Sequence, residues 1–128
     1  MNLVAIGVIQ APMNNKEDCP LQEIEGKPGS VLRVLEEFGD AAQNIHKGSE
    51  LVLLSWLDRS DRSILKTHPR NDPQLPLTGV FSTRSPDRPN PIGIHKVTVL
   101  EVLEKNLFVL SGLDLLDQTP IIDIKVAL

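Results

Sequence analysis

The spacing of apolar and polar positions along the chain is typical of β-strands. Short stretches rich in Val, Ile and Leu recur from end to end, and they lie at residues 3–9, 50–58, 92–104, 106–114 and 119–128. Two shorter segments, 63–68 and 78–82, predict further strands. The pattern therefore predicts a mainly β protein with six to eight strands and one or two short helices.

The order of these segments suggests an architecture. The last three are joined by short turns, which predicts an antiparallel meander. With many strands and little helix, we expect a closed or nearly closed antiparallel β-barrel, because closure removes exposed strand edges. A length of 128 residues suits one domain over residues 1–128.

Two segments depart from the strand pattern. Residues 10–29 are rich in Pro, Gly and Asn and predict a long loop. In residues 31–45 the apolar positions recur at helical spacing, with Ser30 as a potential N-cap. Gly39 weakens the prediction of a helix there, because glycine is a poor helix former.

Composition excludes several classes of protein. The chain is 41% apolar and 23% charged, as ordinary globular proteins are, and no apolar run is long enough to span a membrane. The N-terminus has no secretory signal pattern, and Cys19 is the only cysteine, so we expect no disulfide and a cytoplasmic location. The three histidines lack metal-ligand spacing with one another or with Cys19, so no metal site is expected.

Charge is distributed unevenly along the chain. The net charge of −4 argues against a protein that coats nucleic acid non-specifically. Between Arg59 and Arg88, however, six Lys and Arg residues face only three Asp residues. This basic segment fits either a solvated surface or a site for an anionic ligand.

The segment "GVFSTRSPDRPNPIG", residues 79–93, carries the most distinctive chemistry. Its prolines fix φ and push the preceding residues into extended conformations, so the loop is stiff before any ligand arrives. Arg84 and Arg88 offer guanidinium groups that suit carboxylate or phosphate. A solvated Pro-rich connector and a P-x-x-P ligand for another module are the alternative interpretations. The second is disfavoured because the loop is expected to lie between two core strands.

This segment closely resembles the signature loop of the TsaA-like, or TrmO, family of S-adenosylmethionine-dependent tRNA methyltransferases. "LDLLDQTPIIDIK" (113–125), "AIGVIQAP" (5–12) and "WLDRSD" (56–61) resemble three further segments of that family. The resemblance implies a β-barrel and a homodimer with its active site near the subunit interface. It also implies methylation of N6 of threonylcarbamoyladenosine, next to the anticodon of certain tRNAs. For residues 31–45 it implies a short strand at 31–35 and then a brief helix or turn to about Ile45.

The resemblance also implies a set of site residues. The residues expected to contact S-adenosylmethionine are Gln22, Asp58, Arg59, Arg84, Arg88, Asn90, Ile94, Leu113, Asp114 and Leu115. The general base stays open among Asp58, His68 and Asp117. By its position in the sequence, Trp56 is expected to pack in the core and His95 to lie at an exposed strand position.

Three departures from the family pattern bear on function. Asp58 stands where larger members have His, and Leu21 replaces an Arg between Pro20 and Gln22. We also expect the chain to lack the C-terminal extension by which longer members aid tRNA binding. Two hypotheses therefore stand. The first is a tRNA methyltransferase, with tRNA affinity supplied by the basic segment. The second is an S-adenosylmethionine-binding barrel that methylates a small molecule or acts as a non-catalytic binding or regulatory module.

Overall fold

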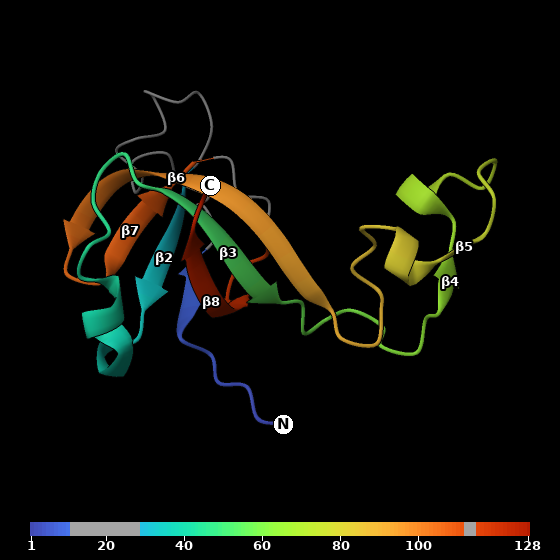
Figure 1. Ribbon diagram of the computed structural model, residues 1–128, viewed down its shortest axis with the longest axis horizontal. Helices are drawn as coiled ribbons and strands as arrows, with labels where there is room; N and C mark the ends of the chain where they lie inside the picture. Colours follow the sequence, from blue (N-terminus) through green and yellow to red (C-terminus); the bar gives the residue numbers. More distant parts are fainter. Residues whose placement is uncertain (11–28, 112–114) are drawn as a thin grey trace.

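The computed structural model describes residues 1–10, 29–111 and 115–128. Six antiparallel strands close into a barrel, in the order β1-β2-β7-β6-β3-β8 (Figure 1). Their bounds are Gly7–Gln10 (β1), Ser30–Val34 (β2), Glu50–Trp56 (β3), Ile92–Glu104 (β6), Leu107–Leu110 (β7) and Pro120–Val126 (β8). The predicted mainly β, closed antiparallel barrel is confirmed.

Alternation of side chains fills the barrel. In the β3–β6 pair, Leu53 lies opposite His95 and Leu51 opposite Val97, so the odd-numbered residues of both strands face inward. The buried core residues are Ile9, Leu32, Val34, Ala42, Leu51, Leu53, Val97, Val99, Phe108, Leu110 and Ile121. Each strand therefore contributes one apolar face to a single barrel interior.

The predicted meander of the last three strands is wrong. β6 and β7 pair with each other, but β8 pairs with β1 on one side and β3 on the other. The barrel closes because β8 bridges the first strand and β3, so the connection after β7 carries the chain to another part of the wall. Sequence adjacency alone does not fix strand order.

Residues 31–45 form a strand and a short helix, as the resemblance implied. β2 ends at Val34, and a 3-10 helix, η2, spans Glu36–Ala42. Gly39 is buried in η2, and a Cβ there would lie 2.9 Å from the Asn106 side-chain amide. Position 39 therefore favours glycine, because the turn before β7 packs directly against the middle of η2. No helix of the described residues is long and apolar enough to cross a membrane.

The long connection from β3 to β6, residues 57–91, projects from one end of the barrel, and we call it the arm (Figure 1). The arm holds a two-stranded sheet, β4 (Lys66–Thr67) and β5 (Thr78–Gly79), and two 3-10 turns, η3 (Pro69–Asn71) and η4 (Val80–Ser82). The strands expected at 63–68 and 78–82 are therefore much shorter than predicted. The signature loop belongs to the arm, so its expected place between two core strands is wrong.

Candidate functional site at the base of the arm

The two ends of the arm are fastened together where they meet the barrel, at Trp56 and Ile92, which lie opposite each other. We call residues 57–62 and 87–91 the neck. Leu57 N donates to Pro91 O at 2.8 Å, and Asp61 N donates to Asp87 Oδ1 at 2.8 Å. These bonds join the outgoing and returning chains, so the signature loop starts from a defined position on the barrel.

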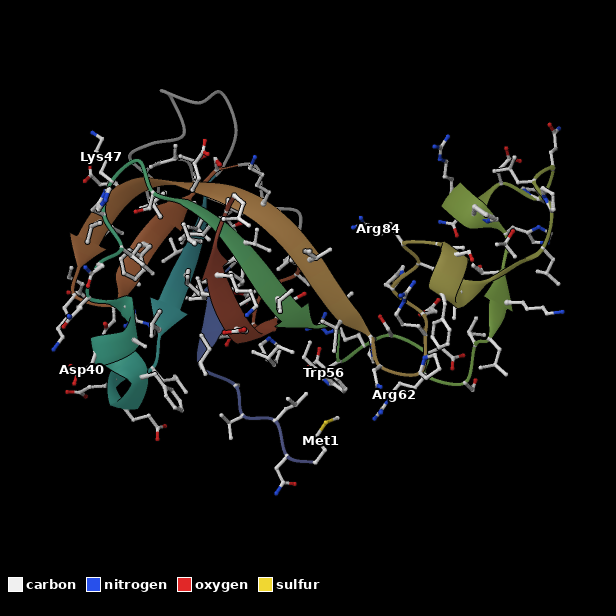
Figure 2. The ribbon with its side chains drawn as sticks, viewed as in Figure 1. Met1, Asp40, Lys47, Trp56, Arg62 and Arg84 are labelled. Carbon is white, nitrogen blue, oxygen red and sulfur yellow. The ribbon has the colours of Figure 1, made fainter. Side chains whose placement is uncertain are left out.

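Arg62 is the main fastener of the neck (Figure 2). Its Nε donates to Pro89 O at 2.7 Å and its Nη2 to Asn90 Oδ1 at 3.1 Å, while the guanidinium lies 5.2 Å from the centre of the Trp56 ring. The cation–π contact means that Trp56 faces the neck from the outer side of β3, and not the barrel core as expected. Sequence reasoning gave Arg62 no such role.

Arg88 shapes the signature loop from inside. Its Nε donates to Ser85 O at 2.8 Å, and its Nη2 donates to Val80 O at 2.7 Å and to Thr83 O at 2.6 Å. Three backbone carbonyls thus converge on one guanidinium, which suits its planar fork of donors. The prolines restrict the chain, and Arg88 selects which compact form it takes.

The predicted cofactor residues lie on both sides of the neck. Asp58 and Arg59 follow β3 in the outgoing chain, and Asn90 lies in the returning chain just before β6. Ile94 is exposed on the outer face of β6, Leu115 packs partly against the barrel core, and Arg84 is exposed on the arm (Figure 2). Gln22, Leu113 and Asp114 lie outside the described residues.

A groove of about 480 Å³ lies where the arm joins the barrel. Trp56, Ile92 and Ile122 form apolar walls, and Arg62 and Asn90 add polar groups. The volume and the mixture of apolar walls with a few polar groups are typical of small-molecule sites. Of the expected cofactor residues, Asn90 lines this groove, and Asp58, Arg59 and Ile94 lie within three residues of Trp56 or Ile92 in the sequence.

The three candidate bases lie on separate segments. Asp58 is exposed at the neck, and Asp117 is exposed in the connection before β8. His68 lies on the arm, where its Nδ1 is 2.8 Å from Leu75 O. Because a carbonyl only accepts, Nδ1 carries the proton in the neutral ring and Nε2 keeps a free lone pair. Among the described residues, no hydrogen bond or ion pair joins Asp58 to His68.

The basic segment divides into two groups. Arg62 and Arg88 are held by protein carbonyls, as described above. Within the described part of the chain, the side chains of Arg59, Lys66, Arg70 and Arg84 make no hydrogen bond or ion pair. These four cations all belong to the arm, which is therefore the part of the molecule best suited to an anionic partner.

Sequence reasoning missed one buried polar pair. Ser55 is fully buried, and its Oγ lies 2.8 Å from Nε2 of His95, which is half-buried and not exposed as expected. Burial lowers the pKa of His95 below its ordinary value of 6.5. Gly93, the last residue of the signature loop, leaves space for the pair, because a Cβ there would lie 2.5 Å from Ser55 Oγ. The signal that reveals this pair is the register of β3 and β6, in which Ser55 lies opposite Gly93.

Metal-ligating side chains do not gather anywhere in the described ranges. No group of three or more His, Cys, Asp or Glu residues is placed to hold an ion there.

Comparison with known proteins identifies the family. The family model described as the tRNA-methyltransferase O N-terminal domain matches residues 8–127. An S-adenosyl-L-methionine-binding protein of Archaeoglobus fulgidus is 38% identical over 125 residues, which cover 98% of this chain and 88% of the relative. A probable S-adenosyl-L-methionine-binding protein of Methanocaldococcus jannaschii is 41% identical over 101 residues, covering 76% and 79%. The chain belongs to the tRNA-methyltransferase O N-terminal domain family.

Solved structures agree in fold. A crystal structure of TrmO is 30% identical with a TM-score of 0.70, and the match covers 100% of this chain and 57% of that one. A crystal structure of TrmO from Pseudomonas aeruginosa is 27% identical with a TM-score of 0.70, covering 100% and 56%. The chain thus spans a little over half the length of these solved proteins.

Proposed function

We propose that the protein binds S-adenosylmethionine at the base of the arm and transfers its methyl group to tRNA, at N6 of threonylcarbamoyladenosine. The observation that carries this proposal is the signature loop, which Arg88 folds and Arg62 fastens to the barrel beside an apolar groove. Family membership supports the reaction class, and the relatives named S-adenosyl-L-methionine-binding proteins support the cofactor.

The residues at the neck fit this cofactor chemically. Adenine needs an apolar ledge, which Ile92 and Ile94 offer on the outer face of β6. The sulfonium and ammonium groups need a nearby carboxylate, and Asp58 lies exposed at the neck. Arg59 and Arg84 have free guanidinium groups for a carboxylate, which both the cofactor's methionine end and the threonyl group of the substrate carry.

When bound, the cofactor supplies a methyl group already activated by its sulfonium. The protein's contribution is to hold the accepting nitrogen in line with that methyl group and to exclude water. Such positioning contributes roughly 7–11 kcal/mol in well-oriented reactions. The stiff loop favours it, because little loop entropy is lost on binding. The proton on the accepting nitrogen needs a base, and Asp58, His68 and Asp117 are the candidates.

A homodimer is part of the proposal. Leu65 and Leu77 on the arm are 67% and 57% exposed, and Ile94 is exposed beside the neck. The arm buries little apolar surface of its own, so it gains by packing against a second copy. We propose that Arg84 of one copy and the Ile94 ledge of the other line the same site in this dimer. The cytoplasmic location expected from the sequence stays a prediction.

A methyl-transfer assay tests the proposal. The protein is incubated with S-adenosylmethionine labelled in its methyl group and with tRNA that either carries or lacks threonylcarbamoyladenosine. We expect label only in the modified tRNA, with much less label for Arg84→Ala and the normal amount for Lys105→Ala, a basic control on the β6–β7 turn. Cofactor binding without any labelled RNA would refute the tRNA reaction.

The net charge of −4 favours a second candidate, an S-adenosylmethionine-binding barrel that acts on a small molecule or on no substrate. The same assay separates the two. Calorimetric binding of the cofactor, combined with an absence of label in every tRNA, is the result expected of the second candidate.

A further inference from the structure

The arm holds a second pocket, of about 560 Å³, between η3 and η4. One wall is formed by residues 68–71 and the other by residues 81–86, which include the start of the signature loop. Two guanidinium groups, those of Arg70 and Arg84, belong to its lining, and none of its described lining residues is acidic. The volume is within the range of nucleotide-sized ligands.

Arg70 is held in an unusual backbone conformation. Arg70 and Asn71 have φ values of 58° and 56°, and Asp72 N donates to Pro69 O at 3.1 Å, as in a type I′ turn. A left-handed conformation costs a non-glycine residue about 1–2 kcal/mol, and Gly or Asn usually occupies such positions. Strained residues of this kind concentrate at ligand sites. The strain here presents a guanidinium that has no partner among the described residues.

Phe81 adds an apolar surface to the same pocket. Phe81 is 83% exposed, whereas the preceding residue, Val80, is buried. The chain has only three Phe and one Trp, so one of its few aromatic rings is left in water beside two free cations. An exposed ring next to guanidinium groups is the combination with which proteins bind single-stranded nucleic acid.

His68 completes the lining with an acceptor. Its Nδ1–H donates to Leu75 O, so Nε2 is free to accept a hydrogen bond from a hydroxyl group. A ribose 2′-hydroxyl is such a donor, and it is the group by which proteins distinguish RNA from DNA.

We propose that this pocket, which we call the arm pocket, binds one single-stranded nucleotide of the RNA substrate. Arg70 holds its phosphate, Phe81 stacks on its base, and His68 Nε2 accepts from its 2′-hydroxyl. S-adenosylmethionine fits the arm pocket less well, because its sulfonium and ammonium outweigh its single carboxylate, and no described lining residue of the arm pocket offers a carboxylate to balance them. The proposal rests on the proposed function, in that it identifies where that function's RNA is held.

Fluorescence anisotropy with a labelled single-stranded RNA and a labelled anticodon stem–loop RNA measures the affinity of the full chain. Phe81→Ala is expected to weaken binding of both probes roughly 5- to 150-fold, the range of base–aromatic stacking, whereas Phe81→Trp retains it. Arg70→Ala weakens binding about tenfold and lowers the slope of log affinity against log salt by about 0.7–0.9. The matched controls are Leu103→Ala and Lys105→Ala, an exposed apolar and an exposed basic residue at the far end of the barrel, and both should bind like wild type.

Cofactor binding is measured in parallel by calorimetry. The proposal predicts that Arg70→Ala and Phe81→Ala bind S-adenosylmethionine normally and that saturating RNA restores their methyl transfer. If wild type methylates RNA and these variants bind RNA normally, the arm pocket has no such role although the proposed function stands. If they lose cofactor affinity instead, the arm pocket belongs to the cofactor and the inference is wrong. A change in oligomeric state without a change in RNA affinity overturns it in favour of a protein contact. A wild-type chain that binds no RNA overturns both.

Discussion

Gly93→Ala tests whether the end of the signature loop is fixed by what packs beneath it. A Cβ on Gly93 would lie 2.5 Å from Ser55 Oγ and 2.6 Å from His95 Nε2, against an ordinary van der Waals contact of 3.4–4 Å. Both side chains have to move by about 1 Å to restore that contact, and that movement separates the Ser55–His95 hydrogen bond. Ser55 is fully buried, so its hydroxyl then has no access to water.

The expected cost follows from these contacts. Overpacking a barrel interior costs about 1–3 kcal/mol, and a buried hydroxyl that loses its partner costs about 1–3 kcal/mol. The same movement of the side chains relieves part of the overpacking and breaks the hydrogen bond, so the two costs do not simply add. We expect a total loss of stability of about 2–4 kcal/mol. At roughly 4 °C per kcal/mol for a chain of this size, the melting temperature falls by about 8–16 °C.

Urea denaturation followed by the fluorescence of Trp56, the only tryptophan, measures this loss. Gly79→Ala is the matched control, because its Cβ meets nothing within 4 Å and its φ of −58° is ordinary, so its stability should equal or slightly exceed that of wild type. In a His95→Ala background one of the two obstacles is gone, and Gly93→Ala should cost clearly less than in wild type. An undiminished cost in that background, or a Gly93→Ala protein as stable as Gly79→Ala, would refute the reasoning.

Three further predictions concern the arm and the barrel. Arg88→Ala removes three hydrogen bonds to loop carbonyls, so we expect amide hydrogens of residues 80–88 to exchange at least about tenfold faster and cofactor affinity to fall. Lys105→Ala is the control and should behave like wild type. Unaltered exchange in Arg88→Ala would count against the role given to Arg88. Arg62→Ala removes the cation from the Trp56 ring and two hydrogen bonds across the neck, so we expect altered Trp56 fluorescence emission and a stability loss of about 1–2 kcal/mol. An unchanged emission spectrum would mean that the neck contact does not form in solution. Burial lowers the pKa of His95 in the folded state, so the unfolded chain binds the proton first, and the free energy of unfolding should fall as the pH is lowered below about 6.5. Urea titrations across pH 5–8 should show a smaller pH dependence for His95→Gln than for wild type. An identical pH dependence in both proteins would contradict this prediction.

The sequence predicted the barrel because strand alternation is a local signal. In β6, the apolar run at 92–104 has the bounds of the strand itself, and its inward residues follow a period of two. Strand order is not local. Whether the last strand pairs with β7 or closes the barrel between β1 and β3 depends on how the whole wall closes, so the meander prediction was wrong.

The arm could be recognised by its residues but not by its form. The prolines and arginines of the signature loop were evident, yet which arginines are free is decided by contacts between segments far apart in the chain. Arg62 meets Pro89 across 27 residues, and Arg88 meets Val80 across eight. The Ser55–His95 pair is similarly hidden, because 40 residues separate two side chains that the β3–β6 register brings together.

A crystal structure with S-adenosylhomocysteine, the demethylated donor, tests the placement of the cofactor most directly. We expect its nucleoside on the Ile92–Ile94 ledge beside the neck, with Asp58, Asn90 and Leu115 of one chain and Arg84 of the same or a second copy in contact. Density in the apolar groove between η2 and β8, lined by Phe38, Ile45 and Ile124, would contradict that placement, as would density nowhere on the molecule.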